Sequence, residues 1–154
     1  MGAYLSAPIT LKESEVGATS RLRHGASSMQ GWRRSMEDAH IVGTEKAGAT
    51  LYGVFDGHGG AEAAELASKD LWPRARQRGA GDVARARESL RGAFDDLQTD
   101  IDEAHTAWPP NATLRAPSTA GTTAVLCIVR DVGDLIDVAH VGDSRAVVGR
   151  RLGG

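Results

Sequence analysis

Cysteine, aromatic residues and long apolar runs are all scarce in this chain of 154 residues. The single cysteine, Cys127, cannot form a disulfide framework within the chain, which fits a reducing compartment. Aromatic residues make up only 5%, so a core must consist mostly of Val, Leu, Ile and Ala. The longest apolar run covers residues 124–129, far fewer than the ~20 residues of a membrane-spanning helix.

An excess of positive charge is also missing, because 18 Lys and Arg residues stand against 20 Asp and Glu residues. A general nucleic-acid-binding protein should carry a basic excess, so we expect no nucleic acid partner. The first residues lack the basic region and apolar run of a secretory signal peptide. We expect a cytoplasmic monomer, with the nucleus or the membrane periphery as further locations.

Short apolar or alternating segments predict strands over residues 23–30, 39–45, 50–55, 122–129, 135–141 and 145–149. Between them we expect two helices, one that follows the glycine-rich residues 56–60 and ends at Pro73, and one over residues 82–105 that Asp82 caps. Residues 1–20 show no period and predict an arm without regular structure. Strands, two adjacent helices and further strands indicate an α+β fold of antiparallel sheets with helices packed on them.

Asp56 directly follows the apolar segment 50–55, where the end of a strand borders a cleft. A carboxylate half-buried there is costly unless a cation compensates its charge. Mg²⁺ and Mn²⁺ prefer oxygen ligands, and Gly57 can offer a bare carbonyl beside the carboxylate. His58 stands next in the sequence as a proton donor.

A second group of polar residues lies upstream and includes Arg33, Glu37 and Asp38. The planar guanidinium of Arg33 suits a bidentate contact with phosphate. Each residue taken alone has a plainer interpretation, since acidic pairs are usually solvated and Asp-Gly is a common turn. The combination therefore decides the hypothesis, and a single residue does not.

Four segments resemble the motifs of the metal-dependent protein serine/threonine phosphatases, the type-2C class. They are residues 28–40 (SMQGWRRSMEDAH), 53–60 (GVFDGHGG), 120–124 (AGTTA) and 141–145 (VGDSR). The resemblance covers about residues 22–150. It implies a four-layer α-β-β-α sandwich, in which two antiparallel sheets lie face to face between helices. It also implies hydrolysis of phosphoserine and phosphothreonine in proteins with two Mn²⁺ or Mg²⁺ ions.

The same resemblance implies which residues bind the metal ions. Asp56 would bridge the two ions and Gly57 would contribute its carbonyl. Glu37 and Asp38 would position metal-bound waters, and Asp143 would lie near a further, weaker metal site.

Arg33 would bind the substrate phosphate, and His58 would protonate the leaving alkoxide. A water between two ions would attack, so no protein nucleophile is needed. Competing mechanisms lack their residues: a cysteine phosphatase needs Arg six residues after its Cys, where Cys127 has Gly133. A phosphatase of the haloacid-dehalogenase type needs a second Asp two residues after the first, and the residue two after Asp56 is His58. The sequence also has no Walker-type phosphate loop, so an NTPase would lack its phosphate-binding segment.

The sequence starts with the M-G-x-x-x-[ST] pattern of N-myristoylation, so Gly2 is a candidate for acylation and for weak membrane association. We expect an N-terminal arm over residues 1–20 and a partial type-2C phosphatase domain over residues 21–154. The family's domain continues further and carries more metal-binding aspartates there. We therefore expect this chain alone to bind metal weakly and to have little or no activity. The alternatives are an inactive fragment that acts as a binding module or does not fold stably, and a different metallohydrolase.

Overall fold

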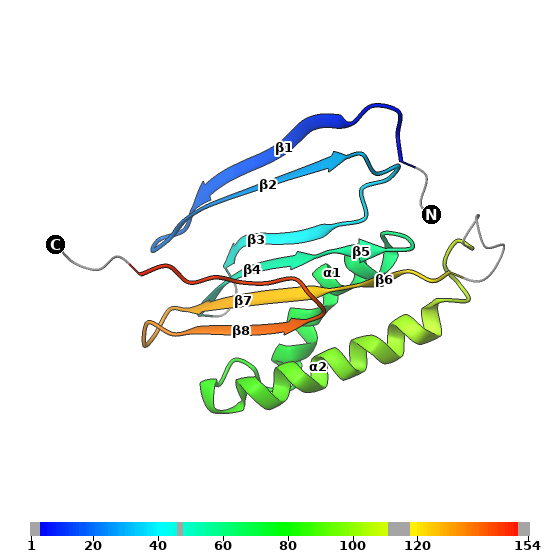
Figure 1. Ribbon diagram of the computed structural model, residues 1–154. Coiled ribbons are helices and arrows are strands. Elements are labelled where there is room, and N and C mark those ends of the chain that lie inside the picture. The colour runs from blue at the N-terminus through cyan, green and yellow to red at the C-terminus, as the bar shows by residue number, and fades with distance from the viewer. Residues whose placement is uncertain (1–3, 46–47, 111–117, 151–154) are drawn as a thin grey trace.

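Antiparallel strand pairing organises the computed structural model, which describes residues 4–45, 48–110 and 118–150. The central sheet has the order β3-β4-β7-β8 (Figure 1). Its strands are β3 (Ala39–Glu45), β4 (Ala49–Phe55), β7 (Ala124–Arg130) and β8 (Ile136–Val141). The other strands form two pairs, namely β1 (Ile9–Ala18) with β2 (Arg23–Gly31) and β5 (Gly57–His58) with β6 (Gly121–Thr122).

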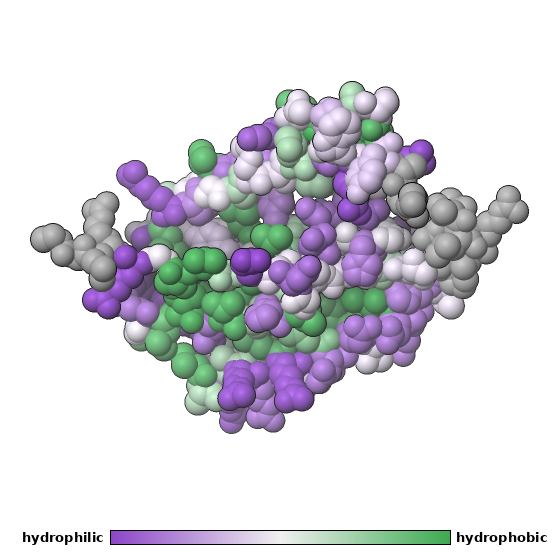
Figure 2. Space-filling model, viewed as in Figure 1, coloured by the Kyte–Doolittle hydropathy of each residue, from purple (hydrophilic) through white to green (hydrophobic). Residues whose placement is uncertain are grey.

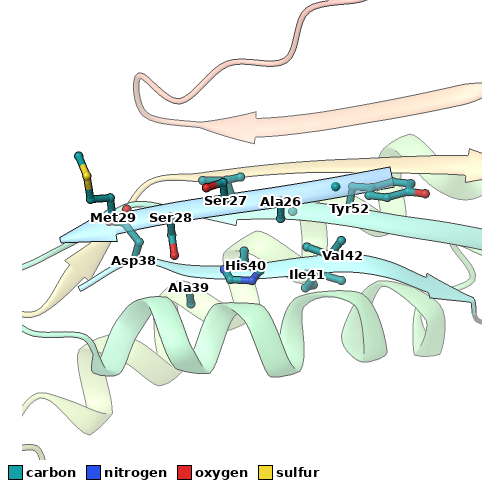
Figure 3. A pocket seen from close by; sticks show the side chains of 13 residues that line it. Ala26, Ser27, Ser28, Met29, Asp38, Ala39, His40, Ile41, Val42 and Tyr52 are labelled. Carbon is teal, nitrogen blue, oxygen red and sulfur yellow. The ribbon is translucent and has the colours of Figure 1, made fainter. Parts of the chain in front are cut away.

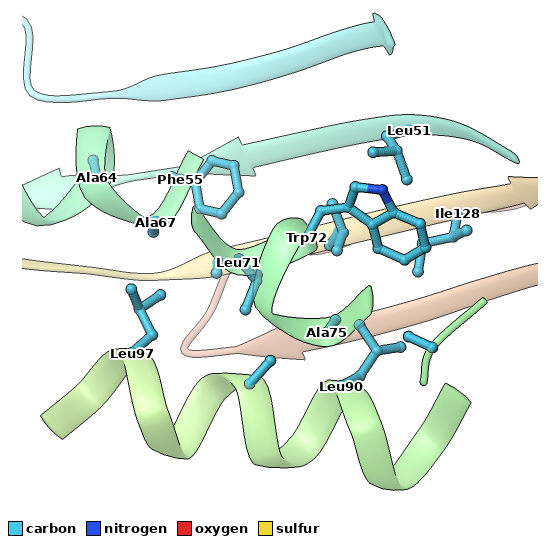
Figure 4. Packing of buried hydrophobic residues seen from close by; sticks show 14 of the residues in the cluster. Leu51, Phe55, Ala64, Ala67, Leu71, Trp72, Ala75, Leu90, Leu97 and Ile128 are labelled. Carbon is cyan, nitrogen blue, oxygen red and sulfur yellow. The ribbon is translucent and has the colours of Figure 1, made fainter. Parts of the chain in front are cut away.

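Two helices, α1 (Glu62–Gln77) and α2 (Val83–Ala104), cover one face of the central sheet (Figure 1). The side chain of Asp82 accepts a hydrogen bond from the backbone N–H of Ala84 at 2.9 Å, which confirms the predicted cap of α2. Figure 4 shows side chains of α1, Trp72 among them, packed between the strands and α2. The hydrophobic core of the protein lies between the helices and the central sheet. No helix among the described residues is long and apolar enough to cross a membrane.

The hairpin of β1 and β2 lies beyond β3, away from the two helices (Figure 1). Helices, central sheet and hairpin account for three of the four layers that the resemblance implies. Within the described residues, no helix covers the hairpin. The antiparallel α+β architecture is confirmed for a partial domain.

The predicted arm is wrong for Ile9–Ala18, which pairs with β2 as a strand. All ten residues of β1 are exposed, so backbone hydrogen bonds rather than burial hold it. Alternation of apolar residues marks a strand only where one face is buried, and the sequence therefore carried no such signal. Gly2 lies outside the described residues.

Two further expectations about regular structure are wrong. Pro73 lies inside α1 instead of ending it, because the buried side chains of Leu71, Trp72 and Ala75 hold the last turns against the core. Their burial offsets the ~3 kcal/mol that an interior proline costs a helix. Residues 145–149 form no strand, since the structure gives them no neighbouring strand to pair with.

Candidate active site

Asp56 lies between β4 and β5, at the end of the central sheet. Its backbone carbonyl accepts a hydrogen bond from the N–H of Thr123 at 2.9 Å. Its own N–H donates to Oγ1 of Thr123 at 3.3 Å. The neighbouring chain segment therefore fixes the backbone of Asp56, while the residue itself stays exposed.

Asp38 reaches the same end of the sheet, because it precedes β3 and the next residue, Ala39, pairs with Phe55. The carboxyl groups of Asp38 and Asp56 are close enough for their charges to interact. Burial raises the pKa of Asp38, the negative charge of Asp56 raises it further, and the positive charge of Arg33 partly opposes both. Two carboxyl groups this close favour a shared proton or a cation between them.

One hollow of about 190 Å³ collects the predicted residues of the first two motifs. Arg33, Glu37, Asp38, Asp56 and Gly57 all line it. The structure therefore brings together five residues that the sequence separates by up to 24 positions.

Arg33 and Glu37 both line this hollow, with Nη2 and Oε2 3.9 Å apart. The Arg33 side chain is 64% exposed, so its guanidinium can reach an incoming anion. Glu37 is more buried, and its Oε1 accepts a hydrogen bond from Oγ of Ser35 at 3.0 Å. Glu37 is thereby held in place, and Arg33 keeps donors for a second partner.

Gly57 is buried against the backbone of the first motif. A Cβ at this position would overlap the carbonyl oxygen of Glu37 and come within 3.2 Å of the Cβ of Ala64. Glycine thus lets β5 approach the segment that carries Glu37 and Asp38. The predicted contact between a cation and the Gly57 carbonyl stays a prediction.

His58 and Asp143 are not among the residues that line the hollow. The His58 ring lies over β6, where a Cβ on Gly121 would come within 2.5 Å of its Nε2. Asp143 is exposed in the turn after β8. The predicted roles of both residues remain predictions.

A larger hollow adjoins the site and shares Met29 and Asp38 with it. Figure 3 shows this space between β2 and β3, with Asp38 at one end and Tyr52 towards the other. The candidate site therefore opens onto the gap between the hairpin and the central sheet.

Comparison with known proteins gives the family of the chain. The family model described as "Protein phosphatase 2C" matches residues 22–153. The chain belongs to the protein phosphatase 2C family.

Curated relatives of this type-2C chain occur in plants. "Probable protein phosphatase 2C 21" of Arabidopsis thaliana is 33% identical over 98% of this chain and 53% of its own length. "Probable protein phosphatase 2C 58" of Oryza sativa subsp. japonica is 35% identical over 97% of this chain and 51% of its own length. The chain thus spans about half the length of these relatives.

Solved structures share the fold of the type-2C chain. The PPM Ser-Thr phosphatase MsPP from Mycobacterium smegmatis, crystallised with cacodylate, matches with a TM-score of 0.52 and 22% identity. That match covers 90% of this chain and 48% of the bacterial one. A C. elegans sex determining protein matches with a TM-score of 0.56 and 22% identity, over 90% of this chain and 31% of the nematode one.

The carboxyl pair of the type-2C chain suits a hard divalent cation. Mg²⁺ is commonly held by one or two carboxylates together with several waters, and Asp38 and Asp56 supply two adjacent carboxyl groups. Among the described residues, no three His, Cys, Asp or Glu side chains converge as a complete ligand set. The residues present therefore fit part of a metal site.

Thr123 and Ser144 are the site residues to which the sequence analysis gave no role. Oγ1 of Thr123 lies 2.6 Å from Oγ of Ser144, so the third and fourth motifs meet beside Asp56. The antiparallel register of the flanking strands could have placed Thr123 opposite Asp56, but the strand pairing is not readable from one sequence.

Proposed function

We propose that this chain is the part of a metal-dependent protein phosphatase that binds Mn²⁺ or Mg²⁺ and the substrate phosphate, for hydrolysis of phosphoserine and phosphothreonine in proteins. The placement of Asp38 and Asp56 in one hollow with Arg33 carries the proposal. The phosphatase names of the curated relatives support it.

The carboxylates bind cations, and the arginine binds the anionic substrate. Asp38 and Asp56 would hold the metal, with Glu37 nearby to position water molecules. Bound divalent ions supply Lewis acidity and a water that loses its proton near neutral pH. Arg33 would contact two phosphoryl oxygens at once and offset the charge that develops on them.

His58 would donate a proton to the leaving serine or threonine oxygen. An alkoxide is a poor leaving group, and a positioned general acid contributes typically ~10²–10⁴-fold. This role requires the exposed His58 ring to reach the substrate oxygen from its place over Gly121.

A phosphothreonine peptide assay with Mn²⁺ tests the proposal. We expect slow phosphate release, in keeping with the little activity expected of this chain alone, and we expect a chelator to abolish it and Asp56→Asn to lower it by at least about tenfold. Asp102→Asn is the matched control, because Asp102 is an exposed carboxylate on α2 that contacts Gln98 and lies outside the hollow. Equal activity of Asp56→Asn and Asp102→Asn would refute the proposal.

The second candidate is a phosphoprotein-binding module without turnover. The missing third ligand among the described residues favours it. Peptide binding that depends on Arg33 in a folded chain without phosphate release would support this candidate against the enzyme.

A further inference from the structure

Thr123 occupies the position directly opposite Asp56 in the strand register. β5 pairs with β6 so that Gly57 lies opposite Thr122, and one step along both chains brings Asp56 opposite Thr123. The register of β4 with β7 leads to the same pairing. Asp56 and Thr123 thus lie between the pairing of β4 with β7 and the pairing of β5 with β6.

The hydroxyl of Thr123 replaces one backbone acceptor in this ladder. Opposed residues of an antiparallel pair can exchange two backbone hydrogen bonds. The Thr123 N–H donates to the Asp56 carbonyl at 2.9 Å, but the Asp56 N–H donates to Oγ1 of Thr123 at 3.3 Å. The Thr123 carbonyl instead accepts from Oγ1 of Thr122 at 2.7 Å. A side-chain oxygen therefore accepts the Asp56 N–H in place of the backbone carbonyl.

The same hydroxyl also meets the turn that carries Asp143. Oγ1 of Thr123 lies 2.6 Å from Oγ of Ser144. Gly142 has a φ of +85°, and a Cβ there would come within 2.8 Å of Cγ2 of Thr123. Both the polar and the apolar branch of Thr123 are thus in contact with residues 142–144.

We propose that Thr123 is a positioning residue for Asp56, through a hydroxyl that fixes the Asp56 peptide and links it to the turn of Asp143. This inference rests on the proposed function, in which Asp56 holds a cation. Rotation of a peptide moves the carboxylate attached to it, so loss of the hydroxyl should misplace the ligand. Groups that orient a metal ligand typically change metal affinity by ~10–100-fold when they are removed.

Three variants of the full chain separate the hydroxyl from the shape of the side chain. Thr123→Val keeps the branched shape and removes the hydroxyl, whereas Thr123→Ser keeps the hydroxyl. Thr44→Val is the matched control, because Thr44 is exposed near the end of β3 that pairs with the start of β4. Circular dichroism checks that each variant folds.

For each variant, one measurement monitors the hydrogen bond of the Asp56 amide and a second monitors Mn²⁺ binding. Hydrogen exchange of the Asp56 amide without metal reports the bond to Thr123, and electron paramagnetic resonance of added Mn²⁺ reports binding. We expect Thr123→Val to exchange this amide faster, by about tenfold, and to bind Mn²⁺ about tenfold more weakly. Thr123→Ser and Thr44→Val should stay within about twofold of wild type.

The outcomes distinguish this inference from the proposed function. A wild-type chain that does not bind Mn²⁺ overturns both. A wild-type chain that binds Mn²⁺, with Thr123→Val equal to it, overturns the positioning role alone, as does Thr123→Ser with the defect of Thr123→Val. If Thr123→Val does not fold, Ser144→Ala decides, because it removes only the outer hydroxyl. Weaker Mn²⁺ binding by a few fold supports the role, and unchanged binding overturns it.

Discussion

The two faces of the central sheet differ in how completely they are covered. On the helix side, Leu51, Leu126 and Ile128 are buried at 2% exposure or less. On the opposite face, Ile136 is 49% exposed and Val138 is 45% exposed. Figure 2 shows apolar side chains gathered over the region of β7 and β8. The same strands thus support a packed core on one side and an open surface on the other.

The candidate site belongs to the open face. Successive side chains of a strand point to opposite faces, so Asp56 follows Val54 on the face away from the buried Phe55. The helix layer supplies stability and the open side supplies the carboxyl groups. Substitutions on the two faces should therefore separate loss of folding from loss of chemistry.

Replacement of one isoleucine on each face by alanine gives the largest expected difference in stability. Ile128→Ala should lower the free energy of unfolding by about 2–5 kcal/mol, because it leaves a cavity beneath the helices. Ile136→Ala on the open face should lower it by less than about 1 kcal/mol, since that side chain is half exposed. Urea unfolding of the two variants checks the difference, and equal losses would contradict the contrast between the faces.

Matched glycines test the backbone contact at the site. Gly57→Ala places a methyl group against the Glu37 carbonyl and should cost about 1–3 kcal/mol of stability. Gly81→Ala meets nothing within 4 Å and should be close to neutral. Thermal unfolding compares them, and a neutral Gly57→Ala would show that β5 does not approach the first motif this closely.

Two aspartate–arginine pairs extend the comparison to charges. Arg130 is 5% exposed and its Nε donates to Asp137 at 2.7 Å, so Asp137→Asn should cost about 1–3 kcal/mol. Asp134 pairs with Arg21 but is 93% exposed, so Asp134→Asn should cost less than about 1 kcal/mol. Chemical denaturation measures both, and a larger cost for Asp134→Asn would reverse the ranking.

The smallest expected effect is a pH dependence of stability that comes from the exposed ion pair of Arg78 and Asp96. The hydrogen bond from Arg78 lowers the pKa of Asp96, and the positive charge of Arg78 acts in the same direction. A depressed carboxyl pKa stabilises the fold above the ordinary value of the group, and this contribution disappears as the pH falls through the folded value. The difference in melting temperature between wild type and Asp96→Asn should therefore shrink as the pH falls below the ordinary pKa of an aspartate. A difference that is constant with pH would contradict this assignment.

The apolar pattern of the sequence predicts strands and helices correctly where one face of the element is buried. The strands β4 and β7 and the helix α2 each have a buried face, and the apolar pattern predicted all three. It failed for β1, which is exposed at every position, and at Pro73, where packing of Trp72 and its neighbours outweighs the proline. The local sequence pattern does not report strand pairing or packing between residues that are distant in the sequence.

The candidate site was predictable in its residue types but not in its internal contacts. The strand-end position of Asp56 and the resemblance of the first two motifs predicted the grouping of Arg33, Glu37 and Asp38 around it. The bond between Asp56 and Thr123 depends on which strands are neighbours, and β6 lies far from β5 in the sequence. Long-range pairing of that kind is set by the whole fold.

The most direct test of the metal-binding claim is a crystal of this chain soaked in Mn²⁺, with anomalous scattering measured at the manganese absorption edge. We predict an anomalous peak in the hollow of Arg33 and Glu37, within bonding distance of carboxylate oxygens of Asp38 or Asp56. A fully occupied Mn²⁺ elsewhere, with no anomalous peak at these two carboxyl groups, would contradict the metal-binding claim.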